Sequence, residues 1–329
     1  MYSFENIEQV KSKIFNSLNE GEFEKLALQL FHFQMENNPI YAPYATFILK
    51  GERPNNIFEI PFLPIEFFKK EQVICKSMGI EEVFLSSGTT GEKSKHLVSD
   101  ISLYKKSLLK SFELSYDKIS DYCLLSLLPN YRESSSLIFM VDELISHSNH
   151  KKSGSYLQDY EKLASTLLQL EKEGQKTILF GVSYALLDLA EQFPQELKHT
   201  IVMETGGTKG KRKELLKEEL HKILKSAFSL QSIHSEYGMT ELLSQSYSKG
   251  KGVFQSPPWK KILIRDINDP LTILENNETG GINVIDLANI YSCPFIATQD
   301  LGRTFDDDSF SVLGRFDNSD VRGCNLMVQ

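Results

Sequence analysis

The segment best suited to chemistry is a run of glycines, hydroxyls and lysines at residues 86–96, directly after the β-rich residues 83–85. Its glycines let the backbone approach an anion closely, its hydroxyls donate hydrogen bonds, and its lysines supply positive charge. Only two residues separate the two glycines, so the run does not match the Walker A pattern, which needs four. We therefore predict a loop that holds a polyphosphate, with a polar surface turn as the alternative.

A second candidate for chemistry is the pentapeptide Gly181-Val182-Ser183-Tyr184-Ala185, which lies between a predicted strand and a predicted helix. It is similar to a G-x-S-x-G nucleophile elbow whose last glycine is replaced. Hydrolases with that elbow place an acid and then a histidine after the serine. Here no aspartate lies between Asp188 and His234, the last histidine. A serine hydrolase or thioesterase using Ser183 is therefore the weaker alternative.

The four cysteines are widely spaced, with no C-x-x-C pair and no histidine at zinc spacing. This density predicts no disulfide framework and favours a reducing, cytoplasmic setting. Cys75, Cys123 and Cys293 lie in apolar or strand-like contexts and are predicted to be core residues. Cys324 differs, because Arg322 lies on its side of an extended chain and would favour the thiolate. Cys324 is a candidate nucleophile, and an inert cysteine is the alternative.

These candidates need a scaffold, and the hydrophobic periodicity predicts an α/β one. The first 35 residues indicate two helices separated by Gly21, and residues 101–117 indicate another. Strands and helices then alternate, which is typical of parallel sheets covered by helices. From about residue 250 the chain changes to short strands with Gly, Pro and Asn turns, a smaller β-rich module. The later predicted strands are 122–128, 177–182, 201–204, 262–265, 282–286, 295–298 and 310–313, and the predicted helices are 134–146, 157–170, 185–193 and 212–228.

Composition and charge narrow the function classes. The chain has 329 residues, 41 % of them hydrophobic, with 36 Lys and Arg against 44 Asp and Glu, a net charge of −8. An acidic surface argues against sequence-independent binding of nucleic acid, which needs basic faces. No apolar run approaches the roughly 18 residues of a membrane-spanning helix. The first residues lack the pattern of a secretory signal, which again indicates the cytoplasm.

Four further blocks, at residues 60–68, 202–207, 233–241 and 314–325, follow one another in order around the 86–96 loop. Together the blocks resemble the acyl-adenylate-forming (ANL) superfamily, and within it most closely the acyl-protein synthetase family of bacterial luminescence. The resemblance implies a ligase that uses ATP and Mg²⁺ to join a carboxylic acid, expected to be a fatty acid, to AMP. It also implies an α/β fold: a large adenylation domain with two helix-covered sheets and a small distorted β-barrel.

The resemblance also implies roles for individual residues of these blocks. Loop hydroxyls and lysines would grip the phosphates, and the 233–241 block would contact adenine, the α-phosphate and magnesium. The implied set is Ser86, Ser87, Gly88, Thr89, Thr90 and Gly91 with Lys93 or Lys95 for phosphate, Gly206, Gly207, Tyr237 and Gly238 for adenine, Thr240 for the α-phosphate, Glu241 for Mg²⁺, Asp300 and Arg315 for ribose, and Phe180, Tyr184 and Leu187 for the acyl pocket wall.

Two positions depart from the family's pattern. Lys93-Ser94 stands where a proline and a lysine are usual, which leaves open whether Lys93 or Lys95 contacts phosphate. Gln299 replaces the glycine of a Thr-Gly-Asp block, which puts the local backbone in doubt. His96 and His234 border the implied site and are predicted to be packing residues.

The end of the chain bears on the second step of the implied reaction, in which the acyl group leaves the adenylate. Only 329 − 317 = 12 residues follow Asp317, too few for the mobile C-terminal domain of the superfamily. We therefore expect an adenylate-forming domain at 1–314, with a helical lead-in at 1–58, and a hinge motif and tail at 315–329. The resemblance implies that Cys324 accepts the acyl group and passes it to a partner acyl-reductase or acyltransferase. An adenylate-binding protein without turnover is the alternative.

Overall fold

The computed structural model describes residues 4–86, 92–129, 134–157, 159–206 and 215–316. The helices are α1 (Phe4–Lys13), α2 (Glu20–Asn37), α3 (Tyr41–Leu49), α4 (Phe67–Lys70), α5 (Ile101–Tyr116), α6 (Ser136–Ser148), α7 (Tyr160–Glu173), α8 (Ser183–Gln192) and α9 (Lys217–Phe228), with short 3₁₀ helices at Ile57–Glu59 and Ile119–Asp121. The strands are β1 (Leu63–Pro64), β2 (Glu82–Leu85), β3 (Lys95–Val98), β4 (Cys123–Leu127), β5 (Gly154–Ser155), β6 (Thr177–Gly181), β7 (Thr200–Thr205), β8 (His234–Tyr237), β9 (Ser246–Ser248), β10 (Val253–Phe254), β11 (Lys260–Arg265), β12 (Gly280–Asp286), β13 (Phe295–Thr304) and β14 (Phe310–Arg315).

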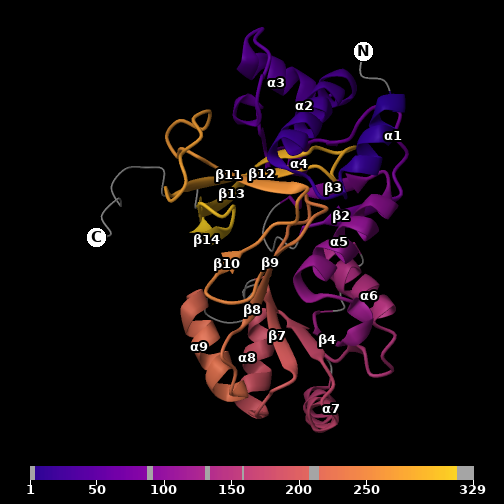
Figure 1. Ribbon diagram of the computed structural model, residues 1–329, viewed down its shortest axis with the longest axis vertical. Helices are drawn as coiled ribbons and strands as arrows, with labels where there is room; N and C mark the ends of the chain where they lie inside the picture. The colour runs from indigo at the N-terminus through magenta and orange to yellow at the C-terminus, as the bar shows by residue number, and fades with distance from the viewer. Residues whose placement is uncertain (1–3, 87–91, 130–133, 158, 207–214, 317–329) are drawn as a thin grey trace.

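One sheet, which we call the parallel sheet, has the strand order β5-β4-β6-β7-β8-β9. All of its neighbours pair in parallel except β8 and β9. Strands β4 and β6 are buried along their whole length, as expected for a sheet covered on both faces. Helices α8 and α9 lie on one side of these strands, and α5 and α6 lie on the other (Figure 1).

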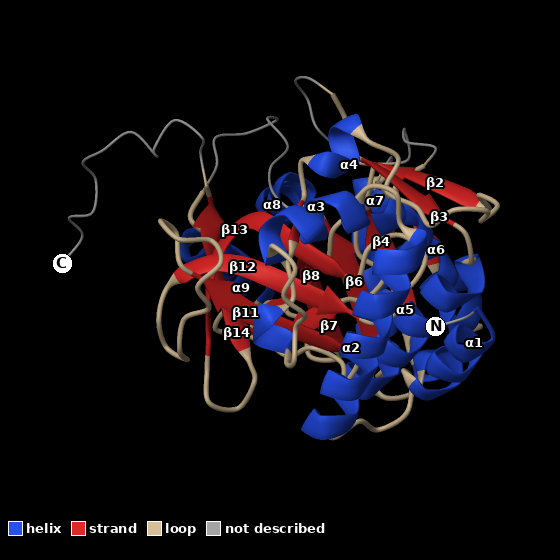
Figure 2. Ribbon diagram, turned by 90° about the horizontal axis from the view of Figure 1, so that it is seen from above, coloured by secondary structure: helices blue, strands red, loops and turns tan. Residues whose placement is uncertain are grey.

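The second sheet, which we call the curled sheet, has the order β10-β14-β13-β12-β11, with β1 paired in parallel to β13. Register shifts near Gly281 and Leu301 mark irregularities in its ladders, and such bulges bend a sheet. The curled sheet lies between helices α2 and α3 on one side and the parallel-sheet lobe on the other (Figure 1). Figure 2 shows the two sheets from above, with the N-terminal helices packed beside them.

The predicted α/β fold class is confirmed, and most predicted elements lie within a few residues of the observed ones. Gly21 does not separate the first two helices: Asn19 and Glu22 form a capping box that begins α2 at Glu20, so Gly21 lies in its first turn. The strand predicted at 295–298 continues to Thr304. No helix within the described residues has the length and apolarity required to span a membrane.

Candidate nucleotide site

Several predicted site residues lie at the carboxyl edge of the parallel sheet. Strands β7 and β8 run in parallel with Thr205 paired to Glu236, so the residues that follow, Gly206 and Tyr237, emerge side by side. Ligands of open α/β sheets bind outside this edge. Gly206 has a φ of 64°, in the left-handed region that favours glycine. Its neighbour Gly207 lies outside the described residues.

The phosphate-loop segment is anchored where it leaves β2 and enters β3. The Ser94 backbone N–H donates to the Ser86 hydroxyl oxygen at 2.9 Å, and the Ser86 N–H donates to the Ser94 carbonyl at 3.0 Å. Lys93 and Lys95 on the β3 side are exposed. The remaining predicted loop residues, Ser87, Gly88, Thr89, Thr90 and Gly91, lie outside the described residues.

The turn after β8 is tied to the base of this loop. Burial raises the pKa of the Glu241 carboxyl, and a hydrogen bond from the Ser94 hydroxyl opposes that shift. His96 Nδ1 lies 2.8 Å from the Thr240 carbonyl oxygen. Two segments 144 residues apart in sequence therefore meet, one carrying the predicted phosphate ligands and the other Thr240 and Glu241.

His96 is the centre of a buried network that the sequence did not predict. Its Nε2 lies 3.0 Å from Asn289 Oδ1, and Asn289 Nδ2 donates to the Glu241 carbonyl at 2.9 Å. Burial lowers the pKa of His96 to about 4, although both of its contacts favour the protonated ring. A neutral ring carries one N–H and so donates to one of the two oxygens at a time. His96 thus packs, as predicted, and in addition holds Thr240 in place.

A second clamp holds the continuation of the turn. Asp286 accepts hydrogen bonds from the backbone N–H groups of Leu243 and Ser244 at 2.8 and 2.9 Å and from the Ser244 hydroxyl at 2.6 Å. Lys260 Nζ donates to the Ser244 carbonyl at 3.0 Å. Both charged side chains are buried, and burial lowers the pKa of Lys260 to about 8. This clamp joins the curled sheet to the turn that carries Glu241.

Tyr237, Asp300 and Arg315 meet at the junction of the two sheets. The Tyr237 hydroxyl donates to Asp300 Oδ2 at 2.9 Å, and Arg315 Nε donates to Asp300 Oδ1 at 3.1 Å. Tyr237 is 8 % exposed, and the rings of Phe254 and Phe310 pack against it. The structure thus brings three predicted nucleotide residues together. Stacking of Tyr237 on adenine stays a prediction.

Glu236 lies on the other side of β8 from Tyr237. A Cβ added at Gly238 would lie 2.4 Å from Glu236 Oε1, so the absence of a side chain at Gly238 leaves room for this carboxyl. Burial raises the pKa of Glu236 to about 7, with Lys260 opposing the shift. Glu236 is thus a carboxyl that titrates near neutral pH beside the predicted adenine residues.

Ser183 does not have the surroundings of a hydrolase nucleophile. Its hydroxyl donates to the Gly206 carbonyl at 2.8 Å and to Glu204 Oε1 at 3.3 Å, and it is buried. Burial raises the pKa of Glu204, but His221 and Lys217 outweigh that effect and lower it. The serine therefore contacts an acid and a carbonyl, and no described histidine lies within hydrogen-bond distance of its hydroxyl. The geometry supports a role in fixing the turn at Gly206.

Two other predictions concern cysteines and the acyl pocket. Cys75, Cys123 and Cys293 are buried, which confirms them as core residues, whereas Cys324 lies outside the described residues. Phe180, Tyr184 and Leu187, predicted to form the acyl pocket wall, are buried in the hydrophobic core. A separate cavity lies between residues 44–66 and the curled sheet, and none of those three residues lines it.

Comparisons with known proteins agree with this architecture. A family model described as "Acyl-protein synthetase, LuxE" matches residues 8–329. No curated protein matches the chain. ATP-bound MatB from Rhodopseudomonas palustris is similar in structure over 72 % of this chain and 48 % of its own, at 17 % identity and a TM-score of 0.56.

Two further solved structures share the fold. The luciferase-like enzyme of the nonluminescent mealworm Zophobas morio is similar over 82 % of this chain and 61 % of its own, at 18 % identity and a TM-score of 0.52. An open conformation of 2-hydroxyisobutyryl-CoA ligase is similar over 92 % and 72 %, at 11 % identity and a TM-score of 0.63. The chain spans about half the length of MatB.

Proposed function

Because the chain belongs to the acyl-protein synthetase, LuxE family, we propose that it activates a carboxylic acid with ATP and then transfers the acyl group to a thiol. In the first step a carboxylate oxygen bonds to the α-phosphorus of ATP while the bond to the β-phosphate oxygen breaks. The products are an acyl-adenylate and pyrophosphate.

The observation that supports this proposal most is the contact between the loop base and the turn after β8. Ser94 hydrogen-bonds Glu241, and His96 lies 2.8 Å from the Thr240 carbonyl. Two anions must meet in adenylation, so the reaction needs donors and positive charge fixed in advance. The described residues on the β3 side of the loop, Ser94 and His96, are thus tied to the turn at Thr240 and Glu241.

The described side chains have the chemistry that ATP and magnesium require. Asp300 is buried and aimed at the junction of the two sheets, where its carboxylate could accept from ribose hydroxyls. Mg²⁺ in nucleotide sites is usually held by one or two carboxylates and by the phosphates, and Glu241 supplies one such carboxylate. When bound, the metal would offset the charge of the phosphates. Lys93 or Lys95 would neutralise the departing pyrophosphate.

For the second step we propose Cys324 as the acceptor. Its sulfur would attack the carbonyl carbon of the acyl-adenylate, the bond to AMP would break, and the thiol proton would pass to solvent. Cys324 follows Arg315 by nine positions, a reach of roughly 30 Å at about 3.3 Å per extended residue. A fatty acid as substrate, a partner acyl-reductase or acyltransferase, and a cytoplasmic location complete the proposal.

Pyrophosphate exchange tests the first step. The protein, ATP, Mg²⁺ and a series of fatty acids are incubated with labelled pyrophosphate, and acid-dependent incorporation of label into ATP is expected. Binding of ATP without exchange for any acid would instead support a nucleotide-binding protein without turnover.

Intact-mass spectrometry tests the second step. Incubation with ATP and an active acid should add one acyl group to the protein, and peptide mapping should place it on Cys324. The variant Cys324→Ser is expected to keep pyrophosphate exchange and lose the thioester. Because the other three cysteines are buried, an adduct on any of them would contradict the assignment.

A further inference from the structure

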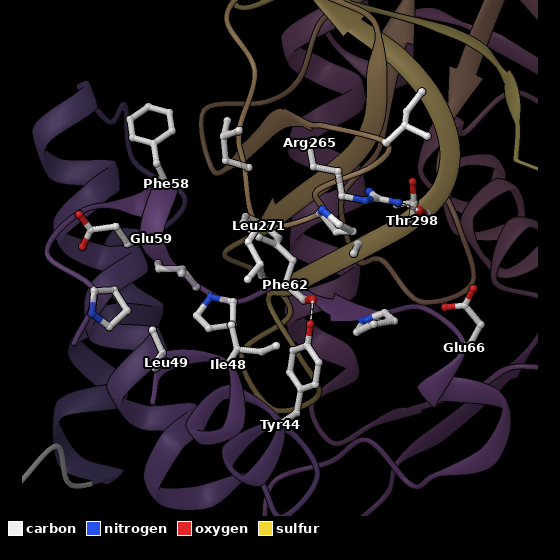
Figure 3. Close-up of a pocket in the computed structure, with 18 of the residues that line it drawn as sticks. Tyr44, Ile48, Leu49, Phe58, Glu59, Phe62, Glu66, Arg265, Leu271 and Thr298 are labelled. Carbon is white, nitrogen blue, oxygen red and sulfur yellow. Dashed lines mark hydrogen bonds between the residues drawn. The ribbon is translucent and has the colours of Figure 1, made fainter. Parts of the chain in front are cut away.

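A cavity of about 510 Å³ lies between the N-terminal segment and the curled sheet, away from the candidate nucleotide site. This volume is within the usual size of a small-molecule site. Figure 3 shows it bounded by Ile48, Leu49 and Phe58 on one flank and by Arg265 and Thr298 on the other.

The wall and mouth of the cavity are mainly apolar. Prolines 54, 61, 64 and 270 contribute rigid parts of the wall. At the mouth, Phe58, Ile267 and Leu271 are 54 %, 42 % and 60 % exposed. Large apolar side chains gathered at a cavity mouth mark a binding site more often than single exposed ones do. The body of a fitting ligand is therefore apolar.

Arg265 forms the polar end of the cavity, which we call its floor. Its Nη1 donates to the Ile282 carbonyl and to Asn283 Oδ1 at 2.8 Å, and its Nη2 donates to the Thr298 carbonyl at 2.6 Å. Of its five N–H groups, two have no partner among the described residues. The three hydrogen bonds and the Phe316 ring, 5.6 Å away, fix the guanidinium. Donors fixed in this way bind an acceptor at a low entropic cost.

The charges around Arg265 decide what kind of acceptor fits. Glu66 lines the same floor, where it accepts a hydrogen bond from Gln299. Its field and that of Asp300, which is paired with Arg315, act on Arg265 without an ion pair to Arg265 within 4 Å. Guanidinium and carboxylate together leave the floor near neutrality. The other charged lining residues, Glu52, Arg53 and Glu59, are exposed, so water and salt screen them. A neutral acceptor fits this floor better than a second carboxylate.

This cavity and the candidate nucleotide site occupy opposite faces of the same strands. On β13, Gln299 lines the cavity, whereas Asp300 points to Tyr237. At the end of β14, Arg315 pairs with Asp300, and Phe316 lines the cavity. Successive side chains of a strand point to opposite faces. Thr298 shares the face of Asp300, and its backbone carbonyl accepts from Arg265 at the cavity. The Gln299 and Phe316 side chains thus belong to a second site on the face opposite Asp300 and Arg315.

We propose that this cavity is a second binding site, for an acyl group whose neutral carbonyl, as in a thioester or an amide, accepts from Arg265 while its chain lies along Ile48, Phe58 and Leu271. Binding needs no ATP and no residue of the nucleotide site. The proposal goes beyond the proposed function, since it concerns a different face of the molecule.

Calorimetric titration without nucleotide tests it. The probes are S-decanoyl-N-acetylcysteamine, decanamide and decanoate, which share one chain and differ in the head group. We expect the thioester and the amide to bind one per chain, each at least about tenfold more tightly than decanoate. Decanoate binding as tightly as the neutral probes would overturn the proposal, as would no binding of either neutral probe.

Variants place the binding in this cavity. Leu271→Asp changes an exposed residue at the mouth and should weaken thioester binding at least about tenfold, whereas Leu114→Asp, at an equally exposed position on α5, should not change it. Arg265→Met should weaken binding to a similar degree. Since Arg265 also bonds the sheet, Leu271→Asp decides the matter if that variant fails to fold. Unchanged binding in Leu271→Asp would contradict the proposal.

One more variant separates this proposal from the proposed function. Asp300→Ala removes a charge whose field reaches Arg265, but its side chain faces away from the cavity, so thioester binding should change by less than about threefold. If the wild type binds the thioester but shows no pyrophosphate exchange, the adenylation proposal fails and this one stands. If exchange occurs and the thioester does not bind, the reverse holds.

Discussion

The two faces of the curled sheet around β13 differ in how their polar groups are satisfied. On the face of Asp300, Tyr237 and Arg315 both donate to one buried carboxylate. On the face of Gln299, a cavity with apolar walls contains Arg265, which donates to neutral oxygens and has two N–H groups without a described partner. Neighbouring residues of one strand thus serve two unlike environments.

This difference shows that adjacent residues of one short motif contact two different sites. In Thr298-Gln299-Asp300, the aspartate belongs to the junction of the two sheets and the glutamine to the cavity behind it. Gln299, the departure from the family pattern, therefore does not approach the nucleotide face. Its amide donates to Glu66 instead. The two faces should respond independently to substitution.

The largest effect is expected from Asp300→Ala. The substitution removes an acceptor of two hydrogen bonds, each contributing about 1.5–3 kcal/mol when one group is charged. We expect kcat/KM for ATP in pyrophosphate exchange to fall about 100-fold, which corresponds to about 2.7 kcal/mol. The matched control is Gln299→Ala, which changes the adjacent residue on the other face and should stay within about threefold of the wild type. Equal losses in the two variants would abolish the distinction between the faces.

His96→Ala should impair the candidate nucleotide site and leave the Arg265 cavity unaffected. The variant removes the one hydrogen bond that the neutral ring donates, to the Thr240 carbonyl or to Asn289, and leaves a cavity where the buried ring was. An unsatisfied buried group costs about 1–3 kcal/mol, and the cavity adds to that cost. We expect the free energy of unfolding in urea to fall by about 2–4 kcal/mol. Pyrophosphate exchange should fall, while binding of the decanoyl thioester in the cavity should not change. A loss of both pyrophosphate exchange and thioester binding in folded protein would show that the two faces of the curled sheet are coupled.

Acid should weaken the same network. Burial lowers the pKa of His96 to about 4, so the unfolded state, with a pKa near 6.5, binds the proton first. Stability from His96 is therefore present above about pH 6.5 and is lost as the pH falls toward 4. Glu236 acts in the opposite direction, since burial raises its pKa to about 7 and favours the folded state at lower pH.

A variant isolates the contribution of His96 to this pH dependence. Between pH 7 and pH 5 the unfolding free energy should change more favourably in His96→Gln than in the wild type, by about 2 kcal/mol, the equivalent of about 1.5 pH units, because the variant lacks the loss that His96 causes and keeps the gain from Glu236. Urea unfolding at the two pH values measures it. An identical change in both proteins would mean that His96 does not titrate as described.

The smallest effect on exchange is expected from Gln299→Gly, which restores the usual motif glycine. Because Gln299 faces the cavity, exchange activity should stay within about twofold of the wild type. Loss of its hydrogen bond to the Glu66 carboxylate should lower the unfolding free energy by about 1.5–3 kcal/mol. A large gain in exchange would instead mean that the glutamine obstructs the nucleotide face.

The sequence predicted the parts of this molecule whose signals are local. The buried apolar runs of β4, β6 and β7 and the helical periodicity of α5 could be located from their own residues. The 237–241 turn could be identified from its resemblance to a family motif. Strand β13 was predicted too short, because after Thr298 polar residues alternate with buried ones and only pairing with β12 and β14 makes them a strand.

The contacts that the sequence did not predict join residues that lie far apart in the chain. His96 contacts Asn289, which is 193 positions away, and Asp286 holds a turn 42 positions before it. Arg265 is a polar residue at the end of a predicted strand, and no local pattern indicates that it lies at the floor of a cavity. Tertiary contacts of this kind cannot be derived from spacing along one chain.

The most direct test of the central claim is a crystal structure of the chain with ATP and Mg²⁺. We predict the ribose beside Asp300, the triphosphate between the loop that begins at Ser86 and the turn at Thr240, and no nucleotide in the Arg265 cavity. A nucleotide bound in that cavity, or at neither face of β13, would contradict the account.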